Sequence, residues 1–276
     1  MSERETLALD VVEATQLSPS LAARLRELTP ARIALRRSGI SLATSEVLDF
    51  QLAHGRARDA VHASLQPAAL LPALRKLANS DPILLHSAAP DRQTFLKRPD
   101  LGRKLNGASR KRLETLANEP CDLAIVLADG LSALAAERNG EPLLAEFLPA
   151  LTHAVPILKL APICVVEQGR VAVGDEVAQL LSAELAIVLI GERPGLSSPD
   201  SLGAYITWRP QPGHTTDAER NCISNIRAEG LSYAQAAARL LHYIREARER
   251  LQTGVTLKDP DEQKLTLDAA REGEPQ

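Results

Sequence analysis

The stretch Ile187–Asn225, IVLIGERPGLSSPDSLGAYITWRPQPGHTTDAERNCISN, decides the fold of this chain. It begins with an apolar run that ends at Gly191 and passes directly into a polar segment that starts with Glu192 and Arg193. A short apolar run bounded by glycine is typical of a buried strand in a parallel sheet. Ligands bind in open α/β sheets along the edge where such strands end. We therefore expect the functional site in the polar residues after Gly191.

Outward from this stretch, short apolar runs alternate with helical patterns from about Ser109 onward. This alternation is typical of a doubly wound parallel sheet with right-handed crossovers. We therefore predict an α/β fold with a Rossmann-like parallel sheet. The predicted strands are Leu123–Leu127, Pro162–Val166, Leu185–Ile190 and Ala204–Trp208, and the predicted helices are Ser109–Ala117, Leu131–Arg138, Pro142–Ala154, Gly174–Leu181 and Ser232–Leu251.

The first hundred residues lack strong strand signals and are predicted to be helical. Proline and hydroxyl residues indicate helix starts at Pro19, at Thr44 or Ser45, and at Pro67. Between the first two helices, Thr29–Gly39 is either an arm that lies on another surface or a solvated basic connector. We expect a smaller helical N-terminal domain over residues 1–104, the Rossmann-like α/β domain over residues 105–256, and a charged, disordered tail over residues 257–276.

The composition excludes several classes of function. The hydrophobic content of 45% is ample for a folded core, and the net charge is −3. With that charge and only seven aromatic residues, nucleic acid is not an expected partner. The three cysteines are widely spaced, which favours neither a disulfide framework nor a zinc site. The charged N-terminus and the lack of a long apolar run predict a cytoplasmic protein with no membrane partner.

Two predicted strand ends carry residues that could take part in chemistry. Asp129 follows the strand that ends at Leu127, where it could hold a ribose hydroxyl or cap the next helix. Glu192 could accept hydrogen bonds from a ligand, or form a surface ion pair with Arg193. The glycines on either side of this pair, Gly191 and Gly195, would let main-chain amides approach a ligand.

The remaining motifs do not make a self-contained catalytic set. Cys222 could be a nucleophile beside Arg220, but His214 is not fixed near it, and a buried structural cysteine is the alternative. The segment Gly169–Asp175 lacks the glycine spacing of a dinucleotide fingerprint, and no Walker A sequence occurs. Ser197 and Ser198 are not in a GxSxG elbow. This pattern favours a ligand-binding chain whose chemistry is performed by a partner.

The sequence also resembles a known family, the small (light) subunit of ethanolamine ammonia-lyase. The resemblance covers roughly residues 29 to 259, in the order and at about the spacing that the family uses. It rests on seven motifs: TPARIALRRSG, ARDAVH, RPDLGRKL, CDLAIVLADGLSA, EQGRVAVGDEV, IGERPGLSSPDSLGAY and ERNCISNIRAEG.

The resemblance implies a subunit of an adenosylcobalamin-dependent lyase that converts ethanolamine to acetaldehyde and ammonia. It implies that cobalamin lies between this chain and a larger barrel subunit, which contains the substrate site, and that this chain carries no catalytic residue. Position by position, the family's cobalamin contacts correspond to Val171, Glu192 and Cys222, with Arg170 and Arg193 as weaker candidates. Because no DxHxxG motif occurs, cobalamin is expected to bind with its own base on cobalt.

The same resemblance implies a hetero-oligomer with a large, mainly apolar interface, typically over ~2,000 Å². The family is associated with bacterial microcompartments, but residues 1–28 form only a short extension, so a cytoplasmic location stays open. Two other functions also stay open at this point. One is a stand-alone α/β enzyme that acts on a nucleotide-like molecule through Asp129 and Glu192, and the other is a purely structural partner of a larger subunit.

Overall fold

The computed structural model describes residues 19–29, 31–116 and 120–258. The chain divides into two compact units. The smaller unit consists of the chain up to Ala57 together with the short segment Gly195–Ser197, and the larger unit contains the rest. The expected disorder of the tail lies almost wholly outside the described residues, as do residues 1–18 of the expected N-terminal extension.

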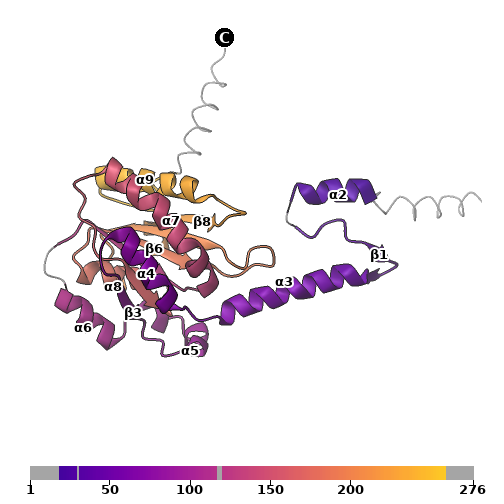
Figure 1. Ribbon diagram of the computed structural model, residues 1–276, viewed down its shortest axis with the longest axis horizontal. Coiled ribbons are helices and arrows are strands. Elements are labelled where there is room, and N and C mark those ends of the chain that lie inside the picture. The colour runs from indigo at the N-terminus through magenta and orange to yellow at the C-terminus, as the bar shows by residue number, and fades with distance from the viewer. Residues whose placement is uncertain (1–18, 30, 117–119, 259–276) are drawn as a thin grey trace, which may run out of the picture. The chain divides into compact units, whose positions relative to one another are not determined.

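The smaller unit is a helix, a hairpin and most of a long helix. It contains α2 (Pro19–Glu27), the antiparallel strands β1 (Arg37–Ser38) and β2 (Ser41–Leu42), and α3 (Thr44–His62), which continues past Ala57 (Figure 1). The helix starts predicted at Pro19 and Thr44 are confirmed. Arg26 holds the unit together, because its guanidinium donates to the carbonyls of Ile33 (3.2 Å) and Ala34 (2.6 Å) and pairs with Glu46 (3.1 Å).

The larger unit is built on a six-stranded mixed sheet with the order β3-β5-β4-β6-β7-β8. The first four strands in this order are parallel, and β7 and β8 extend the sheet in antiparallel pairing. Their bounds are β3 (Ile83–His86), β4 (Leu123–Ala128), β5 (Cys164–Glu167), β6 (Leu185–Gly191), β7 (Leu202–Trp208) and β8 (Arg220–Ile226).

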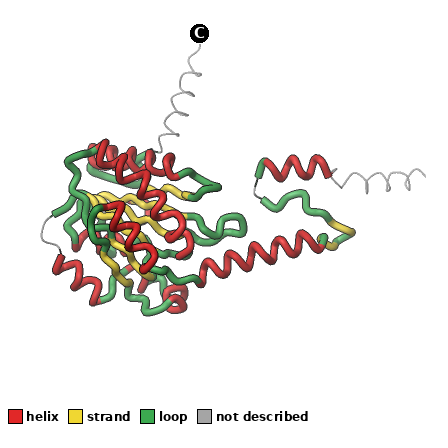
Figure 2. The backbone as a smooth tube through the Cα atoms, in the orientation of Figure 1, coloured by secondary structure: helices red, strands yellow, loops and turns green. Residues whose placement is uncertain are grey.

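Helices cover both faces of this sheet (Figure 2). On one face, here called the α7 face, α4 (Pro67–Ala78), α7 (Ala133–Ala154) and α9 (Tyr233–Arg250) pack on alternate strand residues such as Ile125 and Ile187. On the other, the α8 face, α6 (Gly107–Leu116) and α8 (Val173–Leu180) pack on Val126 and Val188. The described residues also include α5 (Arg92–Lys97) and the 3₁₀ turns η1 (Leu101–Arg103) and η2 (Asp217–Glu219).

The predicted α/β class is confirmed, and four details differ from the prediction. The sheet is mixed rather than wholly parallel, because β6 and β7 are joined by a connection without a helix, which suits antiparallel neighbours. The prediction that residues before 104 contain no strand was wrong, since β3 pairs with β5. Residues 58–104 group with the larger unit. The two helices predicted at 131–154 are one helix, α7, with Pro142 and Pro149 inside it.

None of the helices in the described ranges is both long enough and apolar enough to cross a membrane.

The carboxyl ends of β4 and β6 approach each other so closely that two glycines are required. A Cβ on Gly191 would lie 2.0 Å from the Ser132 carbonyl oxygen and 2.5 Å from that of Asp129. Gly130 has a φ of +54°, and a Cβ there would lie 2.3 Å from the Gly191 carbonyl oxygen. The Leu131 amide donates to that same oxygen at 2.9 Å. Gly191 therefore serves the contact between two main chains and not the approach of a ligand.

Gly191→Ala is expected to lower the free energy of unfolding by about 2–3 kcal/mol, because neither main chain can retreat without breaking sheet pairing. Urea unfolding followed by circular dichroism measures this. Gly107→Ala is the matched control, since a Cβ there meets nothing within 4 Å, and it should change the same free energy by less than about 0.5 kcal/mol. Equal effects of the two substitutions would contradict the tight contact.

Candidate functional site

The turn after β5 is held by the carboxylate of Asp129, at the end of β4. Asp129 is fully buried, and it accepts hydrogen bonds from the amides of Gln168 and Gly169, each at 3.0 Å. Arg92 of α5 lies beside it, with Nη1 at 3.5 Å from Oδ2. Burial raises the pKa of Asp129 to about 6, against the opposing effects of Arg92 and the two amides.

Asp129 neither caps the next helix nor is placed to hold a ribose hydroxyl, the two roles that the sequence suggested. The side chain that caps α7 belongs to Ser132, whose oxygen accepts from the Ala135 amide at 3.2 Å. Both Asp129 oxygens are already bonded within the chain, and none of the side chain is exposed to a ribose. Asp129 therefore positions the turn Gln168–Val171, and a stand-alone enzyme that uses Asp129 loses its main residue.

Glu192 follows β6 and points to the α8 face, because Gly203 lies beside it in β7. A Cβ on Gly203 would come within 3.0 Å of Glu192 Oε1. Glu192 Oε2 accepts from the Ser201 hydroxyl and, at 3.2 Å, from the Asn225 amide. Within the described residues no hydrogen bond ends on Oε1, and no ion pair joins Glu192 to Arg193. Glu192 thus has one oxygen fixed by the chain and one available to a ligand.

Cys222 lies in strand β8, directly opposite Tyr205 of β7. The residue is exposed, and its sulfur lies 3.4 Å from the Ser224 hydroxyl. The pKa of its thiol is raised, chiefly because the surrounding protein displaces water from the sulfur, and further by the charge of Glu192. The pKa of Tyr205 is also raised, chiefly by burial and further by interactions with Cys222 and Glu192. The three side chains therefore lie close together.

The alternative that Cys222 is a buried structural cysteine is wrong, because the residue is exposed, and the structure gives no support to a nucleophile. Its segment was predicted to be a polar loop, whereas it is an edge strand in which Cys222, Ser224 and Asn225 are exposed. No histidine contacts the sulfur within the part of the chain that the structure describes, and the raised pKa keeps the thiol protonated near neutral pH.

Val171 lies in the turn between β5 and α8, on the same face of the sheet. It is half-buried and packs, like Tyr205, against the apolar cluster of the α8 face. The preceding residue, Arg170, stacks on Phe95 with 4.4 Å between its guanidinium carbon and the ring centre. Arg193 contributes to lowering the pKa of Arg170, so these two weaker candidates are neighbours. Val171, Glu192 and Cys222 therefore all lie on the α8 face.

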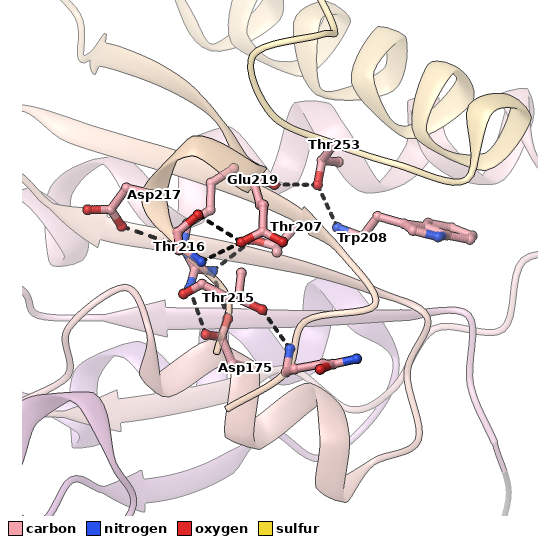
Figure 3. A network of polar contacts seen from close by, with 10 residues as sticks. Asp175, Thr207, Trp208, Thr215, Thr216, Asp217, Glu219 and Thr253 are labelled. Carbon is pink, nitrogen blue, oxygen red and sulfur yellow. Dashed lines mark hydrogen bonds and ion pairs between the residues drawn. The ribbon is translucent and has the colours of Figure 1, made fainter. Parts of the chain in front are cut away.

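A buried ion pair ties β8 to the start of α8 on this face. Arg220 donates to Asp175 through two nitrogens, at 2.7 and 2.6 Å, and to the Thr207 hydroxyl at 3.0 Å. Figure 3 shows Asp175, Thr207 and Thr215 together, next to the capping box that Thr216 forms with Glu219. The pair fixes the separation between the Val171 turn and the Cys222 strand.

Sequence reasoning missed Tyr205, Asp175 and Arg92 as parts of this site. Tyr205 could have been found from alternation in β7, because Leu202, Ala204 and Ile206 are buried and the residues between them face the other way. Asp175 and Arg92 carry no such signal, because each has a partner far away in the chain. Asp175 pairs with Arg220, 45 residues later, and Arg92 pairs with Asp129, 37 residues later.

Arg220→Met is expected to lower the free energy of unfolding by about 3–5 kcal/mol, because it leaves the Asp175 carboxylate buried without a partner. Thermal and urea unfolding measure the loss. Arg98→Met is the matched control, since Arg98 binds Asp100 with the same two-pronged geometry but on the exposed surface, where such pairs add little. A loss for Arg220→Met no larger than for the control would contradict the structural role.

Cys222 is expected to react with iodoacetamide before Cys121 and Cys164, because it is the exposed thiol of the three. Its rate should reach half of its maximum at a higher pH than that of a free thiol standard, because its pKa is raised. Mass spectrometry of peptides labelled between pH 7 and 10 measures both, with Cys222→Ser to assign the signal. Faster labelling than the standard at pH 7 would show an activated thiol instead.

The comparisons with known proteins agree on one family. The model of the family "Ethanolamine ammonia-lyase light chain (EutC)" matches residues 20–258. A small subunit of ethanolamine ammonia-lyase from Pseudomonas putida (strain W619) is 58% identical over 241 residues, which are 86% of this chain and 87% of that protein. The small subunit from Pseudomonas paraeruginosa (strain DSM 24068 / PA7) is 56% identical over 90% of this chain and 91% of that protein. The one from Xanthomonas campestris pv. campestris (strain B100) is 54% identical over 92% of this chain and 93% of that protein.

Proposed function

The chain belongs to the ethanolamine ammonia-lyase light-chain family, and on this premise we propose that it holds adenosylcobalamin against a larger, catalytic subunit. In this proposal Val171, Glu192 and Cys222 contact the cofactor. The chain itself contributes no catalytic residue. The observation that carries the proposal is the convergence of these three positions on the α8 face, where one oxygen of Glu192 is free to accept a hydrogen bond.

The residues present fit the edge of a corrinoid. A corrin ring carries amide side chains that donate and accept hydrogen bonds, and Glu192 Oε1 is an acceptor placed beside the glycine at position 203. Tyr205 and Cys222 add weakly polar groups, and Val171 adds apolar surface. When bound, adenosylcobalamin would supply a radical by homolysis of its cobalt–carbon bond. This chain would bind and orient the cofactor with its own base on cobalt.

The exposed apolar residues of the smaller unit support the proposal that this chain binds a large partner subunit. Leu48, Phe50 and Leu52 of α3 are all exposed, and Ile40 in the hairpin is 99% exposed. Exposed apolar side chains in this number are typical of a protein–protein interface. We propose that they contact the large barrel subunit of the lyase. Residence in a bacterial microcompartment, or otherwise in the cytoplasm, stays a prediction from the family association.

Co-expression of this chain with the large subunit of the same genome tests the proposed function. The two chains should co-purify, bind adenosylcobalamin in a spectrophotometric titration, and form acetaldehyde from ethanolamine only together. Turnover by this chain alone, or a pair of chains that binds no cobalamin, would overturn the proposal.

In that complex, Glu192→Gln is expected to raise the Kd of adenosylcobalamin about tenfold, because a charge-assisted hydrogen bond is replaced by a neutral one. The turnover rate at saturating cofactor should stay unchanged, because Glu192 does not touch the substrate. Glu184→Gln is the control, since Glu184 precedes β6 at its opposite end and pairs with Arg209 on the surface. A lower turnover rate with unchanged affinity would assign Glu192 to catalysis instead.

A further inference from the structure

Three residues hold the Glu192 side chain in one orientation. The main-chain amide of Glu192 donates to the Ser201 carbonyl at 2.9 Å, one residue beyond the pairing of β6 with β7. Its Oε2 accepts from the Ser201 hydroxyl and, at 3.2 Å, from the Asn225 amide. Its Cγ would lie 3.2 Å from a Cβ on Gly203, so the side chain occupies the space that this glycine leaves. Ser201, Gly203 and Asn225 are called the Glu192 clamp below.

A β-bulge in β8 supplies the main-chain donor of the clamp. The register of β7 with β8 shifts at Gly203, where two residues of β8, Ser224 and Asn225, stand opposite one. The extra residue of a bulge is left out of the ladder of hydrogen bonds, and the strand is locally re-aimed. Asn225 has a φ of +61°, a conformation that asparagine tolerates better than most residues. The bulge therefore directs the Asn225 amide to Glu192.

Ser201 is itself anchored from the α7 face of the sheet. Its side chain is buried, and the carbonyl of the preceding residue, Asp200, accepts from Asn139 Nδ2 at 2.7 Å. Asn139 lies buried in the middle of α7, and its own oxygen accepts from the Tyr233 hydroxyl at 2.9 Å. Because these contacts fix Ser201 from behind the sheet, its hydroxyl is a stationary donor for Glu192.

The clamp acts on one carboxylate oxygen and leaves the other for a ligand. Two donors converge on Oε2 of Glu192, whereas no hydrogen bond ends on Oε1 in the parts of the chain that the structure describes. A side chain that is already ordered loses less conformational freedom when a ligand binds, so a clamped acceptor gives a higher affinity than a mobile one. A buried serine, a glycine and a bulge thus all serve the orientation of one exposed oxygen.

We propose that Ser201 is a positioning residue, which together with the bulge at Asn225 turns the free oxygen of Glu192 towards the bound cofactor. The inference rests on the proposed function, in which Glu192 contacts that cofactor. Ser201 is buried and acts only through the Glu192 carboxylate. Every effect of the Ser201 hydroxyl on cofactor binding must therefore disappear when that carboxylate is absent.

The test is a double-mutant cycle in the complex with the large subunit, in which Ser201→Ala, Glu192→Ala and the combined variant are titrated with adenosylcobalamin. Ser201→Ala removes the hydroxyl and keeps the main-chain bond to Glu192. Ser132→Ala is the matched control. The Ser132 hydroxyl is also buried and donates to the same connection between β6 and β7, at the Pro199 carbonyl (2.9 Å), but it does not bond Glu192.

Ser201→Ala is expected to raise the Kd of adenosylcobalamin about fivefold when Glu192 is present, because the released side chain must then be ordered on binding. When Glu192 is replaced by alanine, the same change should alter the Kd less than about 1.5-fold. The control should change the Kd less than about twofold. An unchanged Kd in Ser201→Ala, or an equal rise with and without Glu192, would show that Ser201 is purely structural and overturn the proposal.

Hydrogen exchange at the Asn225 amide, measured on the full chain without cofactor, separates this proposal from the proposed function. Ser201→Ala should speed that exchange severalfold, because Glu192 is no longer held beside the amide, and Ser132→Ala should not. If the wild-type complex binds no cobalamin, the proposed function fails, and the exchange rate alone decides whether Ser201 positions Glu192. Exchange at Asn225 that is as slow in Ser201→Ala as in the wild type would overturn the positioning role in either case.

Discussion

The geometry of the larger unit depends on one buried carboxylate, that of Asp129. It joins the end of β4 to the turn after β5 through two amide hydrogen bonds, and Arg92 ties the same point to the carbonyls of Val61 and Gly130. A buried charge of this kind is costly unless all its oxygens are bonded, and here the main chain bonds them. The positions of Arg170 and Val171 follow, since both belong to the turn that Asp129 holds.

The parts of the fold that could be predicted from the sequence are those in which local pattern and tertiary role agree. Strands β4 and β6 are continuous apolar runs because both of their faces are buried, and Pro67 begins α4 as its position predicts. The four-residue strand β3 was missed because it is too short for a recognisable period. Strand β8 was missed because an edge strand with one exposed face reads as a polar loop.

The candidate site could be predicted only in part, for a related reason. The resemblance to the light-chain family points to Val171, Glu192 and Cys222, but not to what each side chain does. The hydrogen bonds of Glu192 come from residues 9 and 33 positions away, and Arg220 reaches Asp175 over 45 positions. Sequence patterns report on neighbours within a helix turn or a strand pair, and these contacts depend on how the strands are ordered in the sheet.

Hydrogen exchange of the complex, with and without adenosylcobalamin, tests most directly whether the α8 face holds the cofactor. Cofactor binding there should slow exchange in the turn 169–172, after β6 at 191–193, and along the edge strand 221–226, while α4 at 67–78 on the other face stays unchanged. Slower exchange confined to other segments, with these three unaffected in a complex that binds the cofactor, would contradict this placement.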